Sequence, residues 1–228
     1  VLAEMPFVLH TWLRPGNTGA GRDVVEFLKE ALKILPVGLK IRCVRADSGF
    51  FDQKLLGFLE DLGLSYIVVA RLAGPLKGVL SGIKKWTVVE GGYEVSELRI
   101  KLASWNMERR FVVLRERIRE GKEAVGRKLL DVPGYTYRVW VTSRTESAVE
   151  IWRDYNGRAT VEQRIEEMKN DLHADGFYTK AFFATEAAFL GVVLSNNLLS
   201  LYQAQVTRQT VKQVYLIYSL LLLLHAQR

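Results

Sequence analysis

The chain has 228 residues, of which 49% are hydrophobic and 25% are charged, a length and composition that exclude a disordered tail or a fibre. The single cysteine, Cys43, cannot form an internal disulfide, and three scattered histidines lack the spacing of a zinc site. A disulfide-stapled secreted scaffold and a structural zinc module are therefore excluded, and a reducing compartment is expected.

The net charge of +7 is concentrated in one part of the chain. Residues 72–144 carry +7 by themselves, whereas residues 145–173 carry −3. Phosphates need Lys and Arg, and hard cations need Asp and Glu, so a basic segment followed by an acidic one indicates a polyanion-binding surface next to a carboxylate site. A solvated charged face accounts for the same charges equally well.

The first third of the chain alternates strand and helix patterns. In chain order, hydrophobic spacing and Pro or Gly breakers predict a strand at 7–13, a helix at 20–35, a strand at 41–46, a helix at 52–62 and a strand at 66–70. A hairpin between residues 1–4 and 7–13 is also expected. This order predicts an α/β layer in which the last two strands are parallel.

The apolar period changes from about residue 86 to residue 143. Three or more antiparallel strands are predicted there, containing Val95 to Leu102, Phe111 to Leu114 and Tyr135 to Val141. A helical pattern resumes at about 146 and runs to His173, followed by helices at about 184–204 and 210–224.

The two C-terminal helical segments are apolar enough to raise the question of a membrane. Residues 187–207 carry no charge, but Ser195-Asn196-Asn197 lies at their centre. The run at 214–224 is shorter than the roughly 20 residues that a bilayer span needs. Buried core or interface helices, and no membrane partner, are therefore predicted.

Asp47 directly follows the predicted strand at 41–46. Functional side chains in α/β sheets collect at the carboxyl ends of strands, which makes Asp47 a candidate. Two structural roles compete with this interpretation: Asp47 and Ser48 capping the helix at 52–62, or starting a turn at Gly49.

The second candidate is a stripe on the predicted 146–173 helix. Tyr155, Arg158, Glu162 and Lys169 fall within an arc of about 60° at about 100° per residue, beside an apolar stripe. A carboxylate on the border of a buried face tends to bind a cation. An exposed Arg158–Glu162 pair, worth about 0.3–0.5 kcal/mol, is the structural alternative, and Glu166 is the rival carboxylate.

These two blocks resemble the core of an insertion-sequence DDE transposase, of the branch with a β-rich insertion in its catalytic fold. The segment Arg45-Ala46-Asp47-Ser48-Gly49-Phe50 resembles the one that bears the second catalytic Asp of that family. Residues 155–169 match its Tyr, Arg, Glu and Lys signature, with two, three and six residues between successive members. The resemblance covers nearly the whole chain.

The resemblance implies an α/β fold with a ribonuclease H-like core, an inserted antiparallel β subdomain and C-terminal helices. The expected core is discontinuous, and the expected parts are 1–71 and 145–205 for the core, 72–144 for the basic insertion and 206–228 for a C-terminal helix. The implied partners are double-stranded DNA, at transposon ends and target, and a second copy of the chain when two ends are synapsed. The implied location is the bacterial cytoplasm, at the nucleoid.

The implied activity is metal-dependent DNA cleavage and strand transfer at insertion-sequence ends. Two Mg²⁺ (or Mn²⁺) ions, about 3.5–4 Å apart, would be held by two Asp and one Glu. Water attacks first and frees a 3′-hydroxyl, which then acts as nucleophile without a covalent enzyme intermediate. On this mapping Asp47 and Glu162 hold metal, while Tyr155, Arg158 and Lys169 contact transposon-end phosphates.

The sequence departs from the family pattern at the first Asp of the triad. That Asp belongs upstream of the strand at 7–13, where Glu4 is the sole acidic residue and lacks the expected flanking pattern. We therefore expect an N-terminally truncated chain that binds Mg²⁺ poorly and does not cleave DNA by itself.

Two other functions are compatible with the sequence. A non-catalytic DNA-binding remnant, or domesticated fragment, would use the basic β segment and would tolerate loss of Asp47 and Glu162. A restriction-type nuclease is suggested by Glu167-Met168-Lys169 with an upstream Asp. That nuclease site normally lies on a strand, whereas the period here predicts a helix.

Overall fold

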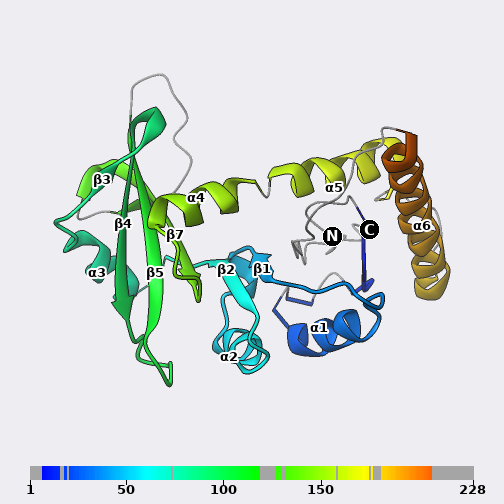
Figure 1. Cartoon of the computed structure of the whole chain (residues 1–228), viewed down its shortest axis with the longest axis horizontal. Coiled ribbons are helices and arrows are strands. Elements are labelled where there is room, and N and C mark those ends of the chain that lie inside the picture. Colours follow the sequence, from blue (N-terminus) through cyan, green and yellow to red (C-terminus); the bar gives the residue numbers. More distant parts are fainter. Residues whose placement is uncertain are drawn as a thin grey trace. The chain divides into compact units, whose positions relative to one another are not determined.

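The computed structural model describes residues 7–15, 18–19, 21–72, 74–118, 127–129, 132–157, 159–174, 176 and 181–206. The chain divides into two compact units, which are described separately. The first unit consists of Val1–Gly49 and Gly157–Arg228, and the second of Phe50–Asn156. The chain contains both helices and strands, which alternate from α1 (Val24–Lys33) to β3 (Thr87–Val88) and are then followed by a run of strands and a run of helices, so the fold is mixed α/β as predicted (Figure 1). The domain boundaries expected from the resemblance stay predictions.

The first unit contains three helices and one strand among its described residues. They are α1 (Val24–Lys33), β1 (Cys43–Ala46), α5 (Ala159–Leu172) and α6 (Phe182–Val206). Val24, Phe27, Leu28 and Ala31 are buried, which is the spacing of one helix face, so α1 forms because it can cover a core. These elements confirm the predicted helix at 20–35, strand at 41–46 and helix at 184–204.

The predicted strand at 7–13 is wrong, because residues 7–15 form no strand. The backbone of Val8 instead meets a side chain of α6. The Val8 N–H donates to Asn197 Oδ1 at 2.8 Å, and Asn197 Nδ2 donates to the Val8 carbonyl at 2.9 Å. The side-chain amide of Asn197 thus makes the two backbone hydrogen bonds that a neighbouring strand would make with Val8. The predicted hairpin partner, residues 1–4, and the helix at 210–224 lie outside the described residues.

The rest of the N-terminal segment packs on α1. The His10 ring stacks on Phe27 with 4.7 Å between ring centroids. His10 Nε2 lies 3.0 Å from Glu30 Oε2, and Trp12 Nε1 donates to the same oxygen at 2.8 Å. Because β-forming aromatic residues here bind a helix face, their strand propensity did not predict the local structure.

A hydrophobic cluster joins the N-terminal segment, α5 and α6. Its buried members are Val8, Met168, Ala174, Phe189 and Val193. Since these residues come from three segments far apart in sequence, burial of their side chains fixes the position of α5 within the first unit.

The second unit is built on an antiparallel sheet (Figure 1, green and cyan strands). Its elements are α2 (Gln53–Asp61), β2 (Ser65–Val69), α3 (Pro75–Ser81), β3 (Thr87–Val88), β4 (Tyr93–Ile100), β5 (Arg109–Arg117), β6 (Arg127–Leu129), β7 (Val132–Thr142) and α4 (Ala148–Asn156). The strand order is β2-β7-β5-β4-β3, and β6 also pairs with β7. The predicted antiparallel strands of the basic segment are thereby confirmed. The parallel pairing expected between residues 41–46 and 66–70 joins the two units and stays a prediction.

Aromatic side chains cover both faces of this sheet. On one face, Trp152 and Tyr155 of α4 contact Tyr93 and Trp140, with ring centroids 5.5 and 5.4 Å apart. On the other face, Phe111 contacts Phe51 and Trp105, and Tyr137 contacts Trp86. Trp86, Trp105, Trp140 and Trp152 therefore belong to the packing of the sheet.

The predicted helix at 146–173 is wrong as a single element, because α4 ends at Asn156 and a separate helix, α5, begins at Ala159. Gly157 forms a turn after α4, and glycine costs about 1 kcal/mol relative to alanine inside a helix. At its start, α4 has a capping box: the Glu150 carboxylate accepts from the Ser147 N–H at 2.9 Å. At its end, α5 stops at His173, whose φ of 52° is left-handed.

A nearly buried ion pair joins α2 to the sheet. Arg109 Nε and Nη2 donate to the two carboxylate oxygens of Glu60 at 2.8 Å each, and the Tyr66 hydroxyl donates to Glu60 at 2.7 Å. Burial alone would raise the pKa of Glu60, but these hydrogen bonds and the Arg109 charge outweigh it, so the pKa lies below its ordinary value. Burial and the Glu60 carboxylate raise the pKa of Tyr66.

Helix α6 exposes most of its apolar surface. Phe189, Val193, Asn196 and Ser200 are buried on one side, while Leu190, Leu194, Leu198 and Leu201 are more than 40% exposed on the other. Among the described residues, Phe182–Tyr202 is long and apolar enough to cross a membrane by length and composition alone. The core or interface helix predicted here is thus buried on one side only.

Replacing Asn197 by alanine should destabilise the first unit, because the N–H and C=O of Val8 both lose their partner. We expect a loss of about 1–3 kcal/mol for the two hydrogen bonds, measured by urea unfolding. Ser195→Ala is the control, since that hydroxyl bonds only to the Gly191 carbonyl of its own helix. Equal effects of the two substitutions would contradict the role of Asn197.

Replacing Glu60 by glutamine should leave the Arg109 guanidinium buried without a counter-charge. We expect a loss of about 3 kcal/mol at pH 7. Because the folded state lowers the pKa of Glu60, its contribution is present above the ordinary pKa and disappears as the pH falls through the folded value. The difference between wild type and E60Q should therefore shrink below about pH 4.5.

The exposed pair of Glu90 and Arg153 supplies the control for this measurement. Glu90→Gln should cost less than about 1 kcal/mol, because both side chains are more than half exposed. A difference between wild type and E60Q that stays constant from pH 7 to pH 3 would argue against the ionised Glu60 as the stabilising species.

Candidate functional site

Asp47 is the first residue after β1, as the sequence predicts. Its Oδ1 accepts the N–H of Gly49 at 2.8 Å, and its side chain is half-buried. Within the described part of the chain, Asp47 has no other hydrogen bond or ion pair. The turn therefore orients the carboxylate, and Oδ2 keeps its capacity to accept a proton donor or a cation.

Of the two structural roles predicted as alternatives for Asp47, a turn at Gly49 and a cap for the helix at 52–62, the structure shows one. The turn at Gly49 is present, but the helix cap is not Asp47. Asp52 caps α2, because its Oδ1 accepts from the Lys54 N–H at 2.8 Å and from the Leu55 N–H at 3.3 Å. Asp47 is thus not needed to start α2.

A close backbone approach supports the Asp47 turn. A Cβ added to Gly21, just before α1, would lie 3.0 Å from the Gly49 carbonyl oxygen. Only glycine fits there without displacing one of the two loops. Gly21 is a residue that sequence reasoning missed, because this requirement depends on a loop nearly 30 positions away.

Glu162 and Lys169 both belong to α5, and their seven-residue separation keeps them on one line of that helix. Met168 is buried, Lys169 is half-buried and Glu166 is exposed. Lys169 thus lies on the border of the buried face, as predicted for the stripe. The side chain of Glu162, and all of Arg158, lie outside the described residues.

Tyr155 ends up in a different setting from the rest of the signature. It belongs to α4 of the second unit, where its half-buried ring lies against Trp140. The predicted continuous stripe from Tyr155 to Lys169 required one uninterrupted helix, so the division at Gly157 overturns that geometric argument for Tyr155. It does not affect the relation between Glu162 and Lys169 within α5.

No group of three potential metal-ligating side chains is found among the residues whose side chains the structure places. The candidate ligands are thus Asp47, whose geometry is described, and Glu162, whose side chain is not. Carboxylate oxygens are the donors that Mg²⁺ and Mn²⁺ prefer, so the chemistry of the pair fits such an ion.

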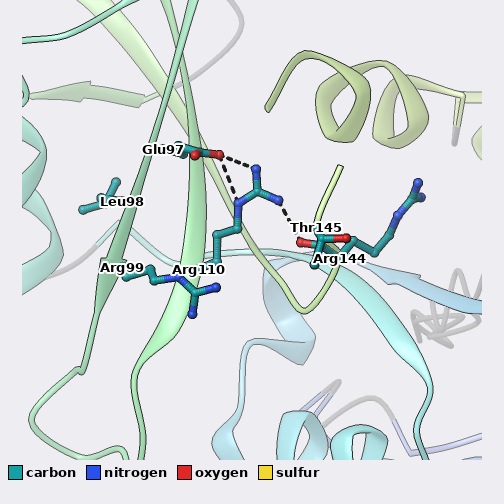
Figure 2. A pocket seen from close by; sticks show the side chains of 6 residues that line it. All are labelled: Glu97, Leu98, Arg99, Arg110, Arg144 and Thr145. Atoms are coloured by element: carbon teal, nitrogen blue, oxygen red, sulfur yellow. Dashed lines mark hydrogen bonds and ion pairs between the residues drawn. The ribbon is translucent and has the colours of Figure 1, made fainter. Parts of the chain in front are cut away.

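Sequence reasoning also missed a polar pocket in the second unit. Glu97, Leu98, Arg99, Arg110, Arg144 and Thr145 line a cavity of about 340 Å³. Figure 2 shows the guanidinium of Arg110 between Glu97 and the Arg144 backbone, with Arg99 beside it. The register of β4 and β5 brings Arg99 and Arg110 together, and it cannot be read from either strand alone. Arg144 and Thr145 reach the pocket from the segment after β7.

Replacing Gly21 by alanine should displace the Asp47 turn. We expect a loss of about 1–3 kcal/mol in stability, because the added methyl group meets backbone rather than a flexible side chain. The control is Gly57→Ala within α2, where nothing lies within 4 Å and a gain of about 0.5–1 kcal/mol is expected. Thermal unfolding of both variants tests this, and a neutral G21A would show that the loops do not approach so closely.

Comparison with known proteins shows the family of the chain. None of the curated proteins matches the chain. A family model described as "Transposase DDE domain group 1" matches residues 6–224, which include β1, Asp47 and the whole of α5. With nearly the entire sequence covered, the chain belongs to the DDE-domain transposase family.

Proposed function

We propose that this chain carries two of the three catalytic carboxylates of a DNA transposase, an enzyme that cleaves DNA at insertion-sequence ends and transfers the freed strand with the help of a divalent metal. The first Asp of the triad is not found before the segment at 7–13, so we do not expect this chain to cleave DNA by itself. The observation that carries the proposal is the family match over residues 6–224. It is supported by Asp47, a half-buried carboxylate with an oxygen free to bind, at the carboxyl end of β1. A ribonuclease H-like arrangement of the core is part of the same proposal.

Asp47 and Glu162 would hold the metal, which is Mg²⁺ or Mn²⁺. When bound, divalent ions at such a site stabilise the attacking and the leaving oxygen of a phosphoryl transfer. Asp47 contributes a carboxylate whose position is restrained, because its Oδ1 accepts the Gly49 N–H. Glu162 contributes a carboxylate from a helix whose position the Met168 cluster fixes within the same unit.

Tyr155, Arg158 and Lys169 would contact DNA phosphates. Lys169 is half-buried on α5, so it can present its ammonium as a point charge on the border of the buried face. Arg158 can form a bidentate pair with a phosphate. We further propose that the chain acts on double-stranded DNA in the bacterial cytoplasm, at the nucleoid, and that two copies assemble when two ends are synapsed.

Mapping of the metal site tests this function. With Fe²⁺ in place of Mg²⁺, ascorbate and peroxide generate hydroxyl radicals at the metal, which cut the nearby backbone. Because a site with two of the three carboxylates binds a divalent ion weakly, Fe²⁺ is supplied in large excess over the protein. We then expect cuts next to Asp47 and within α5 in the same molecules. Asp47→Asn and Glu162→Gln should each remove both sets of cuts, because the two carboxylates share the ion.

Two control variants sharpen the mapping. Asp61→Asn removes an exposed carboxylate from the second unit and should leave every cut in place. Glu166→Gln removes the exposed rival on α5 and should also leave them. If E166Q rather than E162Q abolishes the cuts, Glu162 is the wrong ligand. If no carboxylate variant changes them while DNA binding persists, the chain is a non-catalytic DNA-binding remnant.

A further inference from the structure

The pocket formed by Glu97, Leu98, Arg99, Arg110, Arg144 and Thr145 lies outside the proposed metal site and in the other unit. Arg99 and Arg110 are directly opposite each other in the antiparallel pair of β4 and β5. Like charges in that position repel and destabilise a sheet. Two arginines in this position therefore need negative counter-charge, which a neighbouring carboxylate or a bound anion can supply.

The carboxylates near the pocket neutralise the other cations and not Arg99. Arg110 donates to Glu97 through Nε at 3.1 Å and through Nη2, while its Nη1 donates to the Arg144 carbonyl at 2.7 Å. Arg144 pairs with Glu146 and Asp154, and Figure 2 shows its guanidinium directed away from Arg110. Of the pocket's three arginines, Arg99 is the one without an ion pair in the described structure.

The donors around this cavity suit a tetrahedral anion. Arg99 is exposed and offers all five of its N–H groups, and the side chain of Arg110 is held in place by Glu97. Thr145 is exposed, and its hydroxyl has no partner among the described residues. The cavity, at about 340 Å³, is roughly ten times the volume of one water molecule.

We propose that this pocket seats a phosphate group of the DNA backbone, with Arg99 as the main ligand and Arg110 and Thr145 as supporting donors. The proposal rests on the proposed function, since it takes the anion from the DNA on which a transposase acts. It adds a second contact region to the one expected around α5, located on the basic segment that carries +7. The contact is to the backbone, so it holds DNA without reading its sequence.

Salt-dependent DNA binding by the full chain tests the pocket. The probe is a mixed-sequence duplex of about 30 base pairs, followed by fluorescence anisotropy between about 50 and 300 mM salt. Arg99→Ala should weaken binding about three- to tenfold at 100 mM salt and lower the slope of log K against log salt by about one. Arg99→Lys should restore part of the affinity, because it returns the charge without the planar fork.

Arg117→Ala is the matched control. Arg117 is exposed on β5, and strand alternation places it on the opposite face from Arg110. The R117A substitution removes the same charge as R99A. Equal losses of DNA affinity in the two variants would therefore contradict the phosphate pocket and leave the proposed function intact. Absence of DNA binding by the wild-type chain would instead overturn the proposed function. Circular dichroism melts of both variants show that each is folded at the assay temperature.

Competition with inorganic phosphate distinguishes DNA from a free anion as the ligand of this pocket. If the pocket takes DNA phosphate, about 10 mM phosphate at constant ionic strength should compete with the duplex for wild type and much less for R99A. Phosphate-dependent shifts of arginine Nε–H resonances that vanish in R99A, without any change in its DNA affinity, would assign the pocket to a free anion and overturn the DNA assignment.

Discussion

The amide of Asn197 is the contact on which the first unit depends. It binds both backbone groups of Val8, 189 positions away, and so closes the unit between the N-terminal segment and α6. The cluster around Met168 then packs between the N-terminal segment and α6, and α5 has a defined position within the unit. The placement of the Glu162 backbone is therefore a consequence of an interaction that involves no catalytic residue.

In the second unit, the corresponding constraint is electrostatic. The guanidinium of Arg109 is almost completely buried, and the bidentate bond to Glu60 makes that burial tolerable. Because Glu60 is on α2 and Arg109 begins β5, the ion pair fixes the helix on the sheet face that also carries Phe111. The same sheet presents Arg99 and Arg110 on its other face, so a rigid scaffold holds the proposed phosphate pocket.

The sequence predicts best where one repeated pattern decides the structure. Alternating apolar residues revealed β4 and β7, and a continuous apolar run from Phe111 to Leu114 revealed β5. The position of Asp47 after a short strand was also predictable. The segment at 7–13 has the composition of a strand, but its hydrogen-bond partner is a distant side chain. Helix α3 was missed because it has seven residues, with a proline at its start. The break at Gly157 was missed because apolar periodicity continues on both sides of it.

Helix α6 turns its amides and a serine toward the protein and many of its leucines outward. In most helices the hydrophobic positions tolerate substitution least, whereas in α6 polar positions face the protein. Leu194 and Leu198 are more than half exposed in the described structure, so polar replacements there remove little buried apolar surface. An aliphatic residue at position 197, by contrast, could not bind the Val8 backbone. An engineer who ranks positions by hydrophobicity would choose the wrong side of this helix to alter.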